Sequence, residues 1–166
     1  GWYVSLQWMG LTLHPLGGSL EEIYPLKLDK RAFLVFQPGF ALNVDYEFHR
    51  RFFGRFSFSW YKDCAYVHSG YVHLGIRGVL VDEGRHSLNL GIGPTLIVRE
   101  DWHQFEEYNT DPIFADRIWG KWQYRFLAYG GEIEYLFDIN PKLQLQYSLV
   151  PGLIVFTSKL GIRLKM

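Results

Sequence analysis

A histidine, a cysteine and an aspartate are the residues of this sequence whose side chains could together carry out acyl transfer. His14 follows the run Leu11-Thr12-Leu13, and Asp63 and Cys64 are neighbours in a later segment. Acyl transfer needs a nucleophile, a histidine that removes its proton, and an acid that orients the histidine ring. We therefore take His14, Asp63 and Cys64 as the candidate catalytic residues.

The other histidines do not suggest a second site. His68-Ser69 and His86-Ser87 are adjacent pairs within extended segments, so their side chains point to opposite faces. The sequence has no H-x-x-H motif, and Cys64 is its single cysteine. We expect no metal, no cofactor and no intrachain disulfide.

The composition limits the class of protein. The 166 residues fit one domain, 1–166, and 17 Lys+Arg balance 17 Asp+Glu. A neutral chain of this kind is not expected to bind nucleic acid, whose partners are basic. No apolar run approaches the roughly 20 residues of a membrane-spanning helix. Aromatic residues are abundant, at 18%.

Apolar residues recur at every second position over most of the chain, which is typical of β-strands with one apolar face. In the segment 31–49, for example, Phe36, Phe40 and Leu42 share a face opposite Asn43 and Asp45. The pattern predicts eight strands, at 1–13, 32–48, 51–62, 66–79, 87–99, 123–137, 142–150 and 154–166.

The connections between these strands alternate between short turns and longer loops. The turns 48–51, 81–86 and 138–142 are short, whereas 14–31 and 100–122 are long. This pattern predicts an all-β fold, an eight-stranded antiparallel up-and-down transmembrane β-barrel of the bacterial outer membrane. A soluble barrel or sandwich is the alternative, but an eight-strand interior could hardly hold so bulky an apolar face.

The predicted inward face changes from charged near the short turns to apolar near the long loops. Its acids and bases should pair, because buried charges need partners: Asp45, Glu47, Glu132 and Glu134 with Arg55, Arg77, Lys159 and Arg163. The apolar part should contain Met9, Leu11, Leu13, Phe33, Val35, Ala128 and Val155. Room left by Gly39, Gly75, Gly91 and Gly93 could hold an acyl chain, and an interior packed solid is an equal alternative.

Several short motifs resemble those of the PagP family of lipid A palmitoyltransferases and occur in the same order along the chain. Tyr61-Lys62-Asp63-Cys64 is similar to the family's F-K-D-S, and Leu11-Thr12-Leu13-His14 to its I-T-W-H. Further along, Leu90–Gly93 resembles L-G-L-G, and Val98–Trp102 resembles A-R-D-N-W. The segment Leu143–Gly152 resembles the family's T-F-Q-M-T-Y-I-P-G.

The resemblance implies an eight-stranded outer-membrane enzyme that moves a palmitoyl chain from a phospholipid to lipid A. It would make His14 the base, place Asp63 and Cys64 where the family has Asp and Ser, and put Gly75 at the pocket floor. Pro151 would weaken a strand at a lateral lipid gate. The candidate substrate-binding residues are Gly75, Leu11, Leu13, Val35, Tyr61, Arg99 and Pro151. The expected partners are phospholipid, lipid A and detergent in the lumen, and the expected state is a monomer.

The sequence departs from the family in three places. Cys64 stands where the family has serine, the family's amphipathic N-terminal helix has no counterpart in this sequence, and Met166 stands at the last position instead of an aromatic residue. A non-catalytic small barrel, structural or binding an apolar ligand, is therefore an alternative function. A lipid A deacylase is another, although no histidine follows His103.

Overall fold

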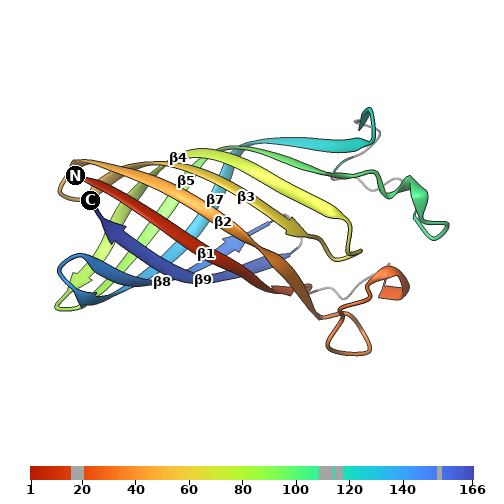
Figure 1. The fold of residues 1–166 in the computed structure, drawn as a ribbon, viewed down its shortest axis with the longest axis horizontal. Helices are drawn as coiled ribbons and strands as arrows, with labels where there is room; N and C mark the ends of the chain where they lie inside the picture. Colours follow the sequence, from red (N-terminus) through yellow and green to blue (C-terminus); the bar gives the residue numbers. More distant parts are fainter. Residues whose placement is uncertain (16–20, 109–113, 115–117, 153–154) are drawn as a thin grey trace.

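Eight long strands wind around one axis and close on themselves (Figure 1). The computed structural model describes residues 1–15, 21–108, 114, 118–152 and 155–166. Within these residues the barrel strands are β1 (Trp2–Leu13), β2 (Leu34–His49), β3 (Phe52–Lys62), β4 (His68–Glu83), β5 (His86–Glu100), β7 (Trp122–Asn140), β8 (Leu143–Pro151) and β9 (Phe156–Lys165). Three short elements lie outside the barrel wall: η1 (Glu21–Ile23), η2 (Trp102–Gln104) and β6 (Ile118–Trp119).

Every strand pairs antiparallel with the next barrel strand, and β9 pairs with β1 to close the sheet. The predicted eight-stranded up-and-down barrel is confirmed. β4 and β7 run further than predicted, to Glu83 and Asn140, while residue 154, the expected start of the last strand, lies outside the described residues. None of the described helical segments is long and apolar enough to cross a membrane.

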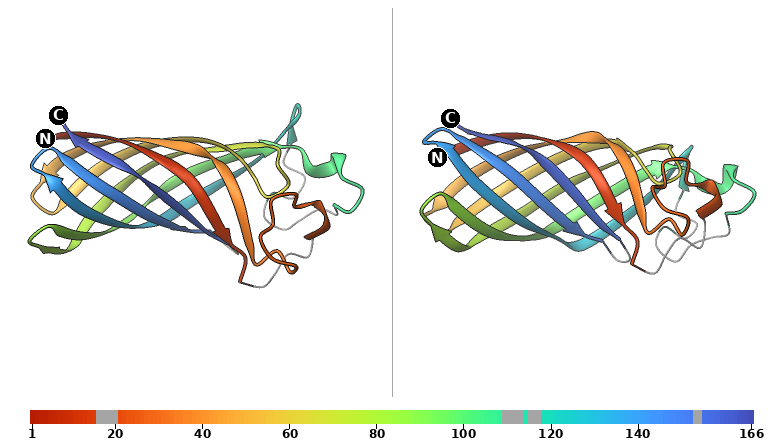
Figure 2. Two further views of the ribbon diagram at one scale, coloured as in Figure 1. Left: turned by 60° about the horizontal axis from the view of Figure 1, so that its bottom comes forward. Right: turned by 90° about the horizontal axis from the view of Figure 1, so that it is seen from below.

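The two ends of the barrel differ, and Figure 2 shows this from two further sides. Both termini and the short turns lie at one end, which we call the turn end, and the long connections lie at the other, the loop end. His14, Asp63 and Cys64 therefore all lie at the loop end, just beyond the ends of β1 and β3.

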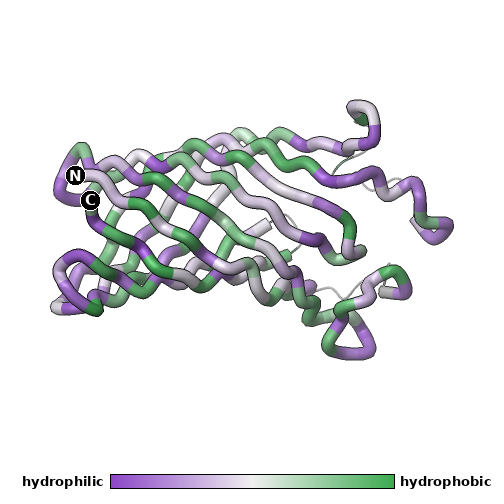
Figure 3. The backbone as a smooth tube through the Cα atoms, in the orientation of Figure 1, coloured by the Kyte–Doolittle hydropathy of each residue, from purple (hydrophilic) through white to green (hydrophobic). Residues whose placement is uncertain are grey.

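The outer face of the barrel is apolar. Figure 3 shows hydrophobic and hydrophilic residues alternating along the strands, and the exposed members include Phe40, Phe56, Leu90, Ile92 and Ile162. Aromatic pairs mark both ends, as in the interfacial girdles of outer-membrane barrels: Trp2 with Tyr46 at the turn end and Trp60 with Trp122 at the loop end. Their rings would lie at the level of the lipid headgroups.

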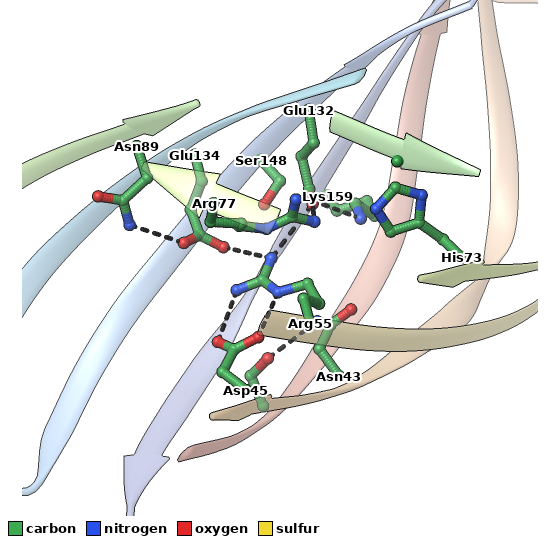
Figure 4. Close-up of polar contacts among 12 residues, drawn as sticks. Asn43, Asp45, Arg55, His73, Arg77, Asn89, Glu132, Glu134, Ser148 and Lys159 are labelled. Carbon is green, nitrogen blue, oxygen red and sulfur yellow. Dashed lines mark hydrogen bonds and ion pairs between the residues drawn. The ribbon is translucent and has the colours of Figure 1, made fainter. Parts of the chain in front are cut away.

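The core of the barrel is a layer of paired charges, shown in Figure 4. Arg55 donates from Nε and Nη2 to Asp45, at 2.5 and 2.7 Å, and its Nη1 lies 2.6 Å from Glu134 Oε2. We call this the charge layer; its members are Asp45, Arg55, Arg77, Glu132, Glu134, Lys159 and Arg163.

Glu132 is the second centre of the charge layer. It pairs with Arg77, with Arg55 at 3.1 Å and with Lys159 at 2.7 Å. Arg163 reaches Asp45 at 3.0 Å. The predicted pairing is confirmed, except that Glu47 lies nearer the turn end, where its carboxylate accepts a hydrogen bond from Tyr3.

A bulge in β1 makes part of the predicted register wrong. The pairing of β1 with both neighbours shifts after Met9, and Ser158 Oγ bonds both the N–H and the C=O of Leu11. One extra residue reverses the faces of a strand. Thr12 is therefore buried, whereas Leu11 and Leu13 lie on the outer face instead of lining the lumen.

A second shift occurs in β7, between the pairs Gly93–Gly130 and Thr95–Leu127. Ala128, expected to point inward, is exposed, and Leu127 lines the lumen instead. Phe33 is also exposed, because it precedes the first residue of β2. The wrongly assigned residues all lie in the half of the barrel near the loops, so the charge layer keeps its predicted register.

We predict that Phe56→Arg lowers the free energy of unfolding by about 2–4 kcal/mol, because it places a charge in the apolar outer belt. Reversible unfolding in phospholipid vesicles measures this. The control is Phe48→Arg at the turn end, where the cost should be about 0–1 kcal/mol. Equal costs at the two positions would contradict the assignment of the belt.

We predict that Asp45→Asn lowers the free energy of unfolding by about 3–5 kcal/mol, since it leaves Arg55 and Arg163 without this counter-charge inside the barrel. Asp82→Asn is the matched control, because Asp82 is exposed at the turn end. The same unfolding measurement compares them. A cost for Asp45→Asn no larger than for Asp82→Asn would show that the layer does not stabilise the barrel.

Candidate functional site

A cavity of about 140 Å³ lies in the lumen on the loop side of the charge layer. Most of its wall is apolar, with Met9, Tyr61, Ile97, Leu127 and Val155 among the lining residues. Its floor is polar and is formed by Ser57, His73, Glu132 and Lys159. Tyr61 and Pro151 are the two members of the predicted substrate-binding set that line this cavity.

The barrel wall is interrupted beside the cavity, between β7 and β8. Among the described residues, the pairing of these strands ends on the loop side at Ile133 and Leu149, although β7 extends beyond Ile133 as far as Trp122. Pro151 contributes to this break because proline has no N–H to donate to a neighbouring strand. We call the unpaired stretch, residues 130–132 and 150–152, the β7–β8 gap. Residues on both of its sides line the cavity, which therefore reaches the barrel wall here.

The glycines expected to leave room for a ligand are covered by neighbouring groups. A Cβ at Gly91 would collide with the Arg77 guanidinium, and one at Gly39 would collide with Tyr61. The His73 ring covers Gly75, which does not line the cavity. The room lies instead beside Gly131, where a Cβ would meet its nearest atom at 3.7 Å, whereas a Cβ at Gly130 would collide with Thr95 Oγ1. Gly131 was not predicted from the sequence; an adjacent glycine pair within a strand was the available signal.

His14 and Cys64 meet at the loop end, as expected. His14 Nε2 lies 3.1 Å from Cys64 Sγ, and Gln37 Nε2 donates to the same sulfur at 2.9 Å. Because Gln37 donates to the sulfur, the thiol hydrogen can be directed to the histidine nitrogen. Thr12 in turn donates to Gln37 Oε1 at 2.7 Å. Neither Gln37 nor Thr12 was predicted from the sequence.

Asp63 does not join this pair in the expected way. Its Oδ1 accepts from the N–H groups of Ala65 and Val67, and its Oδ2 accepts from Trp102 Nε1 at 2.8 Å. The carboxylate thus ties the β3–β4 connection to η2 and does not orient the ring of His14.

Val35 and Arg99 also lie at the loop end rather than in the cavity wall. Val35 is fully buried in an aromatic cluster with Cys64, Tyr24 and Trp102. The Arg99 guanidinium stacks over the Trp102 ring at 3.9 Å and donates to Gln123. Both residues therefore hold the loops in place around the His14–Cys64 pair.

Burial sets the ionisation of the pair. Loss of solvent raises the pKa of the Cys64 thiol to about 12, and the nearby Asp63 carboxylate adds to this. The same loss of solvent lowers the pKa of His14 and raises that of Asp63 to about 6. At neutral pH the pair is therefore a thiol and a neutral imidazole.

The His14–Cys64 pair is separated from the cavity by side chains. Thr12 Oγ1 lies 3.3 Å from Thr157 Oγ1, and Thr157 lines the cavity. Gln37, Thr12 and Thr157 therefore form a chain of polar contacts between the sulfur and the cavity wall. Among the described residues there is no group of His, Cys, Asp and Glu side chains that could hold a metal ion.

Comparison with known proteins identifies the fold. No protein-family model and no curated protein sequence matches the chain. Solved structures do: Ail of Yersinia pestis, crystallised with the heparin analogue sucrose octasulfate, has a TM-score of 0.57 at 16% identity, covering 98% of this chain and 97% of Ail. Neisserial surface protein A has a TM-score of 0.58 at 11% identity and covers 99% and 97%.

The N-terminal barrel domain of Pseudomonas aeruginosa OprF has a TM-score of 0.53 at 11% identity and covers 98% and 96%. None of these three neighbours is named as an acyltransferase. Together with the apolar outer belt, their similarity to this chain agrees with the expected outer-membrane location. The chain thus has the fold of the small bacterial outer-membrane β-barrels.

Proposed function

We propose that this barrel binds part of a membrane lipid in its lumen cavity and admits it through the β7–β8 gap. The observation that carries the proposal is the position of an apolar cavity directly beside an interruption of the barrel wall. Hydrocarbon chains surround the barrel at this level, so they are the apolar groups closest to the cavity.

The energetics favour lateral entry. Strands that lack ladder hydrogen bonds separate at lower cost than paired strands, and Gly131 and Pro151 face each other across the gap without a bulky side chain between them. Each methylene group transferred from water into an apolar site contributes about 0.8 kcal/mol. A chain coming from the bilayer gains less than this, which suits a site that exchanges its ligand.

We predict that Gly131→Leu blocks entry. A Cβ at Gly131 would lie 3.7 Å from Pro151 Cγ, so the first atom fits and the larger side chain fills the gap. The probes are phosphatidylethanolamine with a diazirine in its acyl chain and a free fatty acid with a diazirine near its carboxylate, each in nanodiscs, with labelled residues identified by mass spectrometry. Labelling of Met9, Tyr61 and Ile97 should fall about tenfold, while labelling of the outer face persists. A tenfold fall corresponds to a change of about 1.4 kcal/mol in the free energy of lipid binding or of its entry barrier.

Gly54→Leu is the matched control. A Cβ at Gly54 meets no atom within 4 Å, and its strand neighbours Tyr46 and Ile76 are exposed on the outer face. This variant should leave lumen labelling unchanged. Lumen labelling that Gly131→Leu does not reduce, or a parent protein labelled on its outer face alone, would contradict the proposal.

A second candidate function, acyl transfer from phospholipid to lipid A, is favoured by the contact of His14 with Cys64. In this proposal His14 takes the thiol proton, Cys64 attacks the acyl ester to form a thioester, and the lysophospholipid leaves with the proton held by His14. A lipid A hydroxyl then attacks the thioester, and its proton returns through His14 to the sulfur. Tyr61 and Pro151 line the cavity, while Val35 and Arg99 hold the loops around the pair. The resemblance to the lipid A palmitoyltransferases supports it. The buried thiol with its raised pKa requires that the loop end open before reaction.

If this second candidate is correct, His14→Ala abolishes the added acyl chain in lipid A, measured by mass spectrometry of cells that express the protein. Cys64→Ser should retain or raise transfer, because a serine hydroxyl can replace the thiol beside the same histidine. His103→Ala is the control, since His103 is a loop histidine bonded to Asp101. Transfer unaffected by His14→Ala, or no transfer by the parent, would eliminate this function and leave lipid binding untouched.

A further inference from the structure

We infer that the lumen cavity receives the carboxylate end of a single-chain fatty acid, whose hydrocarbon chain leaves through the β7–β8 gap. The inference rests on the proposed lipid binding and deepens it, because it names the class of ligand and the direction in which the ligand lies.

The cavity floor contains polar atoms that lack partners. Ser57 and His73 line the cavity and are 1% and 6% exposed. Within the described part of the chain, no group hydrogen-bonds to Ser57 Oγ or to His73 Nε2. The other ring nitrogen of His73, Nδ1, lies 2.7 Å from Thr95 Oγ1, which fixes the ring. When Thr95 donates its hydrogen to Nδ1, Nε2 carries the ring hydrogen and can donate it. Buried polar atoms normally have partners, so these two indicate a polar ligand group.

Two further groups at the same level can donate to an oxygen. Tyr71 OH accepts a hydrogen bond from Lys159 Nζ at 3.0 Å, which leaves its own hydrogen to donate. The ammonium group of Lys159 also pairs with Glu132. All four side chains, those of Ser57, Tyr71, His73 and Lys159, line the cavity. A carboxylate accepts several hydrogen bonds at once, which matches such a set of donors.

The charge beneath the floor also favours an anion. The charge layer contains four cationic side chains, Arg55, Arg77, Lys159 and Arg163, but three carboxylates, Asp45, Glu132 and Glu134. These seven side chains therefore leave the layer with one cation in excess. A single carboxylate on the floor would balance the charge.

The size of the cavity decides the direction of the ligand. An apolar cavity of about 150 Å³ holds one benzene molecule, so this cavity of about 140 Å³ holds about six non-hydrogen atoms. That is enough for a carboxyl group and the first few carbons. The rest of a long chain must lie in the gap and the bilayer. A chain entering methyl end first would leave the floor atoms unpartnered.

The test compares palmitate with methyl palmitate, which has the same chain but no ionised carboxylate. Delipidated protein in phosphatidylcholine nanodiscs is titrated with each ligand, and bound ligand is measured by isotope counting. Palmitate should bind at least tenfold more tightly than methyl palmitate. Ser57→Ala and His73→Phe should each weaken palmitate binding severalfold and change methyl palmitate binding less than twofold.

Ser148→Ala is the matched control, because Ser148 is buried in the lumen but bonds Gln7 and does not line the cavity. It should leave both affinities unchanged. Equal affinities for palmitate and methyl palmitate would overturn the inference. If the lumen of the parent protein is nevertheless labelled by phospholipid, the proposed lipid binding stands. No binding of palmitate and no lumen labelling would overturn both. The comparison of ligands on the parent protein does not depend on any variant folding.

Discussion

The charge layer is the interaction on which the rest of this barrel depends. Asp45, Arg55, Arg77, Glu132 and Lys159 come from five different strands, so the layer links most of the wall across the lumen. Charges held away from water are stable only when each has partners at short distance, which makes the arrangement of these strands specific. The layer also closes the lumen, because side chains fill an eight-stranded barrel at that level. An open channel is therefore not expected here.

The barrel wall is interrupted on the loop side of the charge layer. Beyond the charge layer the β7–β8 ladder ends at Leu149, and two bulges, in β1 and in β7, loosen the regular pairing. Such departures cost stability in a barrel whose wall must satisfy its backbone groups. The β7–β8 gap and the two bulges all border the cavity, which lies between the charge layer and the buried cluster at the loop end.

Much of the fold could be predicted because alternation of apolar and polar residues directly reports the two faces of a strand. The strands, their order and the charge layer follow from that pattern alone. The bulge at Gly10 could not be placed, because the alternating pattern assumes an uninterrupted strand and does not show where a bulge inserts an extra residue. Leu11, Leu13 and Ala128 were misassigned for this reason, and Thr12 and Gln37 were missed beside Cys64. The separation of the His14–Cys64 pair from the cavity is a tertiary feature with no local signal.

That separation bears on how the two candidate sites relate. A lipid in the cavity and the sulfur of Cys64 are divided by Thr157, Thr12 and Gln37, which hydrogen-bond to one another and to the sulfur. Acyl transfer would require this chain to break, whereas binding of a ligand on the cavity floor leaves it intact. The unpartnered atoms of Ser57 and His73 also lie at the far side of the cavity from the loops. The polar contacts of the lumen therefore favour a ligand whose polar head group binds the cavity floor. They do not favour a substrate whose ester is held at the loop end for reaction with Cys64.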